Sequence, residues 1–421
     1  MPNSDSTGCD DHDPYAALRL RDFRLLLIGR FITSFGSEML TFAIAWELWV
    51  RTQSAFSLGM VGLVQVLPIL LFSLPAGHFA DQHNRRRIVM MTRGAYVCCA
   101  LGLAWLSHAQ GAIILISFCL MGIGICRAFS EPASSTLIPE TVPPEIFTSA
   151  ATWMSSTWQL ALIAGPAVAG VIVALASRVT VIYIADACAS FVFLILLSII
   201  KGRTLALSNK STTWASLAEG LRFIRDTKVL FAAITLDMFA VLFGGAVALL
   251  PIYATDILKV GPRGLGIMRA APSVGAILMA FVLAHLPPFK KAGKTLLLAV
   301  AGFGMATIVF GLSRLFWLSV LMLVLLGGLD NISVIIRSTL LLLRTPDEMR
   351  GRASAVNGMF ISASNELGGF ESGLAASFLG PVIAVVGGGV CTILVALAVA
   401  KVWPEMIHLG PISAFENEFD K

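Results

Sequence analysis

Residues 77–87 read Gly77-His-Phe-Ala-Asp-Gln-His-Asn-Arg-Arg-Arg87 and form a short charged stretch between two long apolar runs. The run before it, residues 57–76, has no charged residue, so it can cross a hydrocarbon core of about 30 Å at about 1.5 Å per residue. A second apolar run begins at Ile88. A turn this short between two spans must lie at one membrane face, and three successive arginines favour the cytoplasmic face.

The whole chain has the composition of an integral membrane protein. Of its 421 residues, 57% are hydrophobic and 13% are charged, whereas a soluble domain has about 25% charged residues. The formal net charge of +5 comes from basic residues in short loops between apolar runs. That is the positive-inside pattern, so we expect a lipid bilayer and no nucleic acid as the partner.

Apolar runs bounded by Gly, Pro and charged residues predict an all-α membrane protein with twelve transmembrane helices. The predicted spans are 22–50, 57–80, 88–108, 111–133, 147–176, 179–200, 229–257, 263–286, 294–312, 316–342, 352–377 and 381–403. The connection at 201–228 is the one long loop, and its segment Trp214-Ala-Ser-Leu-Ala-Glu-Gly-Leu-Arg-Phe-Ile-Arg225 has apolar residues at helical spacing. We therefore predict an amphipathic helix on the cytoplasmic surface there.

Basic residues are distributed unevenly between the two sides of this topology. The segments on the side of residues 77–87 hold eighteen Lys and Arg, whereas the opposite loops hold five, namely Arg51, Arg178, Lys259, Arg263 and Arg314. Since basic loops stay in the cytoplasm, both termini are predicted to be cytoplasmic. The tails are residues 1–21 and 404–421.

A weak internal repeat divides the chain into two halves, residues 22–200 and 229–403. Gly62-Leu-Val-Gln-Val-Leu-Pro68 corresponds to Gly266-Ile-Met-Arg-Ala-Ala-Pro272, 204 residues later. Two six-helix halves in parallel orientation are typical of secondary transporters whose ligand site lies near the bilayer midplane, between the halves.

The charged stretch resembles the signature loop of the major facilitator superfamily, Gly-x-Leu-Ala-Asp-Arg-x-Gly-Arg-Arg, between the second and third of twelve helices. The matching residues are Gly77, Ala80, Asp81, Arg85 and Arg86. Asn84 stands where Gly is usual, and since Asn tolerates positive φ we expect the same turn geometry. The resemblance implies that Gly77, Asp81, Arg85 and Arg86 form a cytoplasmic gating element. The alternative is a basic loop that only sets topology, but such a loop needs neither Gly77 nor Asp81.

Two further segments resemble one branch of that superfamily. Arg127-Ala-Phe-Ser-Glu-Pro-Ala133 and Thr345-Pro-Asp-Glu-Met-Arg-Gly-Arg352 are similar to segments of the enterobactin-exporter-like and macrolide-efflux-like proteins. The resemblance covers residues 15–403. It identifies the branch better than the substrate.

Ionisable residues inside the spans are costly to insert, so each is a candidate for proton coupling or for the substrate cavity. The candidates are Arg30, Glu38, Arg127, Glu131, Asp237, Asp330 and Arg337, with Glu366 as a secondary candidate. The alternative for Arg30 and Glu38 is that each pairs with a neighbouring helix and only stabilises the bundle. The alternative for Arg127 and Glu131 is an ion pair one turn apart on the same helix. The resemblance puts Asp186 on a peripheral helix, and Arg269 and Glu371 on helices that form the seam between halves, so these three carry less weight.

Glu38 is the first candidate for the proton-coupling group because it lies near the middle of the first span. Arg30 is eight residues away, about 12 Å along a helix, so we expect no fixed pair and a carboxylate free to exchange protons. Arg127 and Asp330 occupy related places on the fourth and tenth helices, which line the central cavity in this superfamily. Asp330 could therefore be tied to Arg127.

Fold and motifs together imply a proton-coupled secondary exporter of an amphipathic small molecule, such as a siderophore, a macrolide or another drug. We expect a monomer in a bacterial inner membrane. Two alternatives remain: a lysophospholipid-type lipid transporter of the same fold, and a non-transporting sensor on a transporter scaffold. An enzyme would need a nucleophile with its base, or a metal cluster. The scattered His and Cys residues provide neither, so we expect no enzymatic activity, no cofactor and no metal.

Overall fold

The computed structural model describes residues 15–135, 137–176, 178–200, 214–287, 289–407 and 409–410. The helices of the first half are α1 Ala16–Arg19, α2 Arg21–Thr52, α3 Ala55–Gln82, α4 Arg85–His108, α5 Ile113–Ser135, α6 Leu137–Thr141, α7 Phe147–Ala176 and α8 Thr180–Ile199. Those that follow are α9 Trp214–Asp226, α10 Lys228–Phe243, α11 Leu250–Ile252, α12 Gly261–Ala284, α13 Ala292–Leu312, α14 Phe316–Arg344, α15 Asp347–Leu379, α16 Pro381–Val402 and α17 Pro404–Ile407. The all-α prediction is confirmed.

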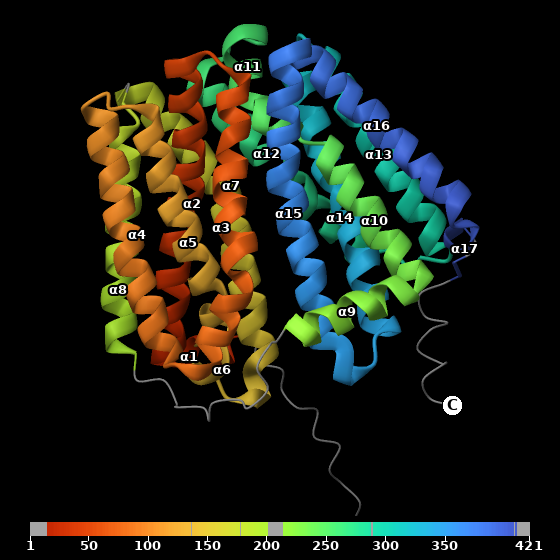
Figure 1. The fold of residues 1–421 in the computed structure, drawn as a ribbon, viewed down its shortest axis with the longest axis horizontal. Coiled ribbons are helices and arrows are strands. Elements are labelled where there is room, and N and C mark those ends of the chain that lie inside the picture. Colours follow the sequence, from red (N-terminus) through yellow and green to blue (C-terminus); the bar gives the residue numbers. More distant parts are fainter. Residues whose placement is uncertain are drawn as a thin grey trace, which may run out of the picture.

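Two groups of long helices stand side by side, α2–α5 with α7 and α8 in one and α10 with α12–α16 in the other (Figure 1). Among the described residues, eleven helical segments are long and apolar enough to span a membrane. The predicted span missing from this set is the eleventh, α15, which has 33 residues but carries charges in its first two turns and, near its middle, at Glu366 and Glu371. It packs between α3 and α10, where Glu366 and Glu371 are half-buried.

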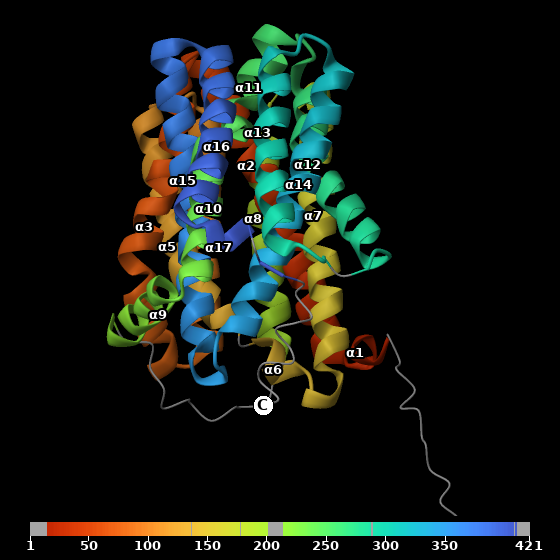
Figure 2. The same cartoon turned by 90° about the vertical axis from the view of Figure 1, so that its right-hand side faces the viewer.

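One end of the bundle carries α1, α6 and α9, and the opposite end carries α11 (Figures 1 and 2). We call these the terminal end and the distal end. The helix predicted in the long connection exists as α9, and Ile224 on it is 1% exposed. It packs on the terminal end of α15, where Arg352 Nη1 lies 2.6 Å from Glu219 Oε2. Residues 201–213 of the connection lie outside the described residues.

The seventh span is not a continuous helix. α10 ends at Phe243, and the chain continues through a 3₁₀ turn at Ala246–Leu249, the short α11 and a π turn at Tyr253–Ile257. The break falls at Gly244 and Gly245, which lie against Phe303 and against the α15 backbone. Neighbouring backbone can approach so closely only because these residues lack a Cβ. The apolar periodicity of the sequence gives no sign of this break.

The two halves are packed tightly at the distal end. A Cβ added to Gly266 on α12 would lie 2.6 Å from the Pro166 carbonyl oxygen on α7, and one added to Gly59 on α3 would lie 3.0 Å from Gly373 on α15. Trp49 Nε1 also donates a hydrogen bond of 2.7 Å to Thr255 Oγ1 across the halves. The distal end is therefore closed.

The same helices are more loosely packed toward the terminal end. A Cβ added to Gly77 on α3, or to Gly351 or Gly358 on α15, would meet no atom within 4 Å. A hollow of about 150 Å³ lies there between α3, α5 and α15. The two halves are therefore packed closely at the distal end and more loosely toward the terminal end.

Candidate functional site

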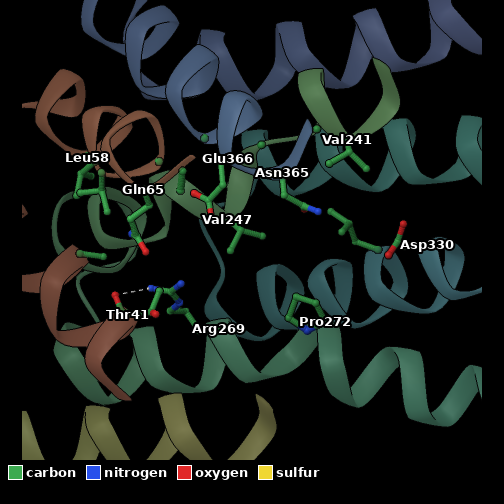
Figure 3. Close-up of a pocket in the computed structure, with 18 of the residues that line it drawn as sticks. Thr41, Leu58, Gln65, Val241, Val247, Arg269, Pro272, Asp330, Asn365 and Glu366 are labelled. Atoms are coloured by element: carbon green, nitrogen blue, oxygen red, sulfur yellow. Dashed lines mark hydrogen bonds between the residues drawn. The ribbon is translucent and has the colours of Figure 1, made fainter. Parts of the chain in front are cut away.

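A cavity of about 410 Å³ lies between the two halves, about midway along the helices. It is lined by Thr41, Ala45, Leu58, Val61, Gly62, Gln65 and Arg127 from the first half and by Val241, Gly244, Gly245, Val247, Ala248, Arg269, Pro272, Phe303, Leu326, Gly327, Asp330, Asn365, Glu366 and Gly369 from the second. Most of the lining is apolar, with a few polar and charged groups that converge on the space (Figure 3). Such a lining suits an amphipathic small molecule.

Arg127 is fixed on the wall of this cavity by two neutral neighbours. Its Nη1 donates to Gln65 Oε1 at 3.3 Å, and its Nη2 donates to Ser37 Oγ at 2.6 Å. It forms no ion pair with Glu131 on its own helix, and none with Asp330, so the pairing of Arg127 with Asp330 is wrong in this conformation. The hollow toward the terminal end is also lined by Arg127 and Glu131, so Arg127 borders both spaces.

Arg269 is the charged cavity residue to which sequence reasoning gave too little weight. From α12 its Nη1 donates to the Thr41 carbonyl oxygen on α2 at 3.2 Å, which joins the two halves beside the cavity (Figure 3). The internal repeat of the sequence contains a sign that Arg269 lines the cavity, because Arg269 occupies the position that corresponds to Gln65. Both positions project into the cavity, one from each half.

Glu38 lies on α2, half-buried beside the cavity rather than in its lining. Gly165 on α7 packs against Glu38, since a Cβ added to Gly165 would lie 2.6 Å from Glu38 Cβ. Arg269 and Arg127 are the charged groups that act on its carboxylate. Among the described contacts Glu38 has no ion pair, with Arg30 or with any other base, as expected from the spacing. The two arginines act on it only electrostatically, so its freedom to exchange protons stays a prediction.

Glu366 has the same two electrostatic partners, Arg127 and Arg269. It projects into the cavity from α15 (Figure 3), and its own main-chain carbonyl oxygen lies against Gly62 on α3. Glu38, Arg127, Arg269 and Glu366 thus form a group of two acids and two arginines, with one of each from each half. We call this group the charge tetrad.

Arg30 lies away from the central cavity. It donates to the Ser134 carbonyl oxygen at 3.4 Å and lines a separate hollow with Ser34 and Trp158. Glu131 and Arg93 are the charges that act on it. Arg30 is therefore placed among the helices of the first half, where a structural role accounts for its contacts.

Asp237 and Arg337 form an ion pair between α10 and α14. Both residues are about 5% exposed or less, and neither lines the central cavity. Asp330, two turns before Arg337 on α14, does line the cavity. Of these three candidates from the sequence, the structure thus places only Asp330 in the cavity and pairs the other two away from it.

Removing one partner of this ion pair is expected to leave the other charge buried and uncompensated. Asp237→Leu and Arg337→Leu should each lower the free energy of unfolding by about 3–5 kcal/mol, whereas the double variant should recover most of it. Thermal unfolding in detergent measures this. A double variant no more stable than either single variant would show that the pair is not the source of the loss.

The gating motif lies at the terminal end of the first half. α3 ends at Gln82 and α4 begins at Arg85, with the Asn84 side chain accepting a hydrogen bond of 3.2 Å from the Arg87 amide. Asn84 has φ −63°, so the expected left-handed turn is wrong and Asn84 acts as a helix N-cap. Arg86 Nη2 donates to the Ser198 carbonyl oxygen of α8 at 2.7 Å. The Asp81 side chain lies outside the described part of the chain.

Asp186 is the least exposed of the remaining acids. It accepts a hydrogen bond of 2.9 Å from Tyr96 Oη, and Arg93 and Arg127 act on it electrostatically. Arg93 in turn lies over the Tyr96 and Phe193 rings. These residues tie α4 to α8 inside the first half.

Comparison with known proteins places this geometry in a family. The sequence matches the transmembrane secretion effector family over residues 12–410. It is 22% identical to the enterobactin exporter EntS of Escherichia coli (strain K12) over 395 residues, 92% of each chain. It is 23% identical to EntS of Citrobacter koseri over 404 residues, 94% of this chain and 93% of that protein.

A solved structure has the same fold. It is a bacterial homologue of the human lysosomal transporter Spinster in an inward-facing and occupied conformation, with a TM-score of 0.73 and 15% identity, and the match covers 94% of this chain and 99% of that chain. At that identity the likeness concerns the fold alone. It supports the arrangement of long helices in two groups seen in Figure 1.

Proposed function

Since this chain belongs to the transmembrane secretion effector family, in the enterobactin-exporter-like branch of the major facilitator superfamily, we propose that it is a proton-coupled exporter of an amphipathic small molecule. Like its relatives, the chain is a multi-pass membrane transporter and not an enzyme. The observation that carries the proposal is the mostly apolar cavity between the halves, with the charge tetrad at its edge.

The mechanism proposed is alternating access. The halves 22–200 and 229–403 rock about the central cavity, so that it opens to one side of the membrane at a time. The positive-inside bias supports a cytoplasmic terminal end, and the bacterial relatives support the inner membrane as the location. In this orientation the structure represents the inward-facing state, closed at the periplasmic side.

Proton coupling is assigned to the charge tetrad. An acid that bridges arginines from both halves is a group whose protonation changes how strongly the halves attract each other. Glu38 and Glu366 both meet this description, because the arginines that act on them come from different halves. The proposed direction of transport rests on the relatives named as enterobactin exporters, and the proposed substrate class rests on those relatives and on the mostly apolar cavity lining with its few charged groups. Siderophores, macrolides and other drugs fit the relatives and the lining.

The test uses the purified chain, as a monomer in liposomes, with an imposed pH gradient and no nucleotide. The panel contains a catecholate siderophore, a macrolide, a lipophilic cationic dye and a lysophospholipid. We expect at least one of the first three to move with the gradient, and a protonophore to abolish that movement. Movement of the lysophospholipid alone would favour a lipid carrier. Binding without any movement would favour a sensor.

A further inference from the structure

Asp330 lies at one end of the central cavity, on α14. Figure 3 shows it apart from Thr41 and Arg269, on the side of Val241 and Pro272. Phe303, Leu326 and Gly327 also line the cavity from the second half. The carboxylate therefore stands in mostly apolar surroundings.

Asp330 has no ion-pair or hydrogen-bond partner among the described residues. Arg337, on the same helix, is occupied by Asp237. Arg127 is held by Gln65 and Ser37, and Arg269 is held by the Thr41 carbonyl oxygen. Asp330 is half-buried, and an ionised acid without a partner is costly in apolar surroundings. A ligand that brings the opposite charge therefore gains that energy on binding.

The charges around the cavity leave Asp330 uncompensated. In the charge tetrad, the two glutamates balance the two arginines, and each glutamate is acted on by both arginines. No described charged group acts on Asp330 in the same way. The ionised groups of the lining alone balance, Arg127 and Arg269 against Glu366 and Asp330. When Glu38 beside the lining is counted with them, three acids surround two arginines, and Asp330 is the acid on which neither arginine acts.

We propose that the cavity selects a solute with one positive charge on an apolar or aromatic body, and that Asp330 receives that charge. This rests on the proposed function, in which the cavity is the substrate site. The volume of about 410 Å³ lies in the range of sites for drug-sized ligands, about 300–1,000 Å³. Phe303 lines the same cavity, and an aromatic ring face adds attraction for an organic cation.

Two probes of the same size and opposite charge test this inference. Tetraphenylphosphonium and tetraphenylborate have nearly identical shapes, so a difference in binding reports the charge preference of the site. Binding of each is measured to the full chain in lipid nanodiscs without any gradient, with empty nanodiscs subtracted. We expect saturable binding of tetraphenylphosphonium, at least about tenfold tighter than that of tetraphenylborate.

The role of Asp330 is tested by three variants. Asp330→Asn should weaken tetraphenylphosphonium binding at least about tenfold, and Asp330→Glu should retain most of it. Glu371→Gln is the matched control, because Glu371 lies on α15 outside the cavity lining, and its affinity should be unchanged. If Asp330→Asn does not fold, Val241→Lys, which places a fixed cation in the same cavity, should abolish binding instead.

Three results would overturn the proposal: no saturable tetraphenylphosphonium binding by the unmodified chain, equal affinity in Asp330→Asn, or a preference for tetraphenylborate. The outcome is separable from that of the transport test. Binding that depends on Asp330 without gradient-driven movement would leave the cation site standing and refute the exporter. Gradient-driven movement of an anion that does not depend on Asp330 would leave the exporter standing and refute the cation site.

Discussion

Replacement of Gly266 by alanine is expected to lower gradient-driven transport by about tenfold or more. The added Cβ would lie 2.6 Å from the Pro166 carbonyl oxygen, a contact that α7 and α12 can relieve only by moving apart. Overpacking of this kind costs about 1–3 kcal/mol, and about 1.4 kcal/mol shifts an equilibrium tenfold. The cost falls on the state closed at the distal end, so the variant should remain open there and complete few cycles.

Labelling of a cysteine placed at the cavity residue Ala45 reports this shift toward the state that is open at the distal end. In a version whose seven native cysteines are replaced, Ala45→Cys should react with a membrane-impermeant reagent from the periplasm only when Gly266→Ala is also present. Gly387→Ala is the matched control, since a Cβ there would meet no atom within 4 Å. Normal transport and no external labelling in Gly266→Ala would refute the conclusion that close packing of α7 on α12 keeps the distal end closed.

Glu38→Gln is expected to abolish transport driven by a pH gradient while preserving exchange of substrate across the membrane without a gradient. Glutamine keeps the size of the side chain but neither binds a proton nor attracts Arg127 and Arg269, the two charges that act on Glu38. The loaded carrier could still reorient, because exchange requires no net proton movement. The loss would therefore lie in coupling and not in substrate binding.

Both activities are measured in the same proteoliposomes. Glu38→Asp, which keeps the ionisable group, should retain part of the gradient-driven transport, and Glu371→Gln should behave as the unmodified chain. Full gradient-driven transport by Glu38→Gln would transfer the coupling role to Glu366, the other acid between the same arginines. Loss of exchange as well would indicate a role in substrate binding or in reorientation.

The fold could be predicted from the sequence because its determinants are local. Apolar run lengths define the spans, and the charged stretch at residues 77–87 specifies a turn at one membrane face. The break in the seventh span could not be predicted in this way. It depends on how closely α13 and α15 approach Gly244 and Gly245, which apolar periodicity does not encode.

The candidate site could be predicted only in part, since pairing between helices depends on their rotation and depth. Arg127, Asp330 and Glu366 were placed by their positions within spans, and all three line the cavity. Arg337 could not be assigned to Asp237 rather than to Asp330, because α14 presents Asp330 and Arg337 within two turns. Arg269 was given too little weight because its helix forms the seam, yet its position repeats that of Gln65.

The central claim is that the two halves alternate about the cavity, and pulsed electron–electron distance measurements test it most directly. Spin labels at Val50 and Asp256 report the distal end, and labels at His83 and Gly351 report the terminal end. Upon acidification with a transported substrate present, the distal pair should lengthen while the terminal pair shortens. Distances that stay constant at both ends, or that change together in the same direction, would contradict alternating access in this protein.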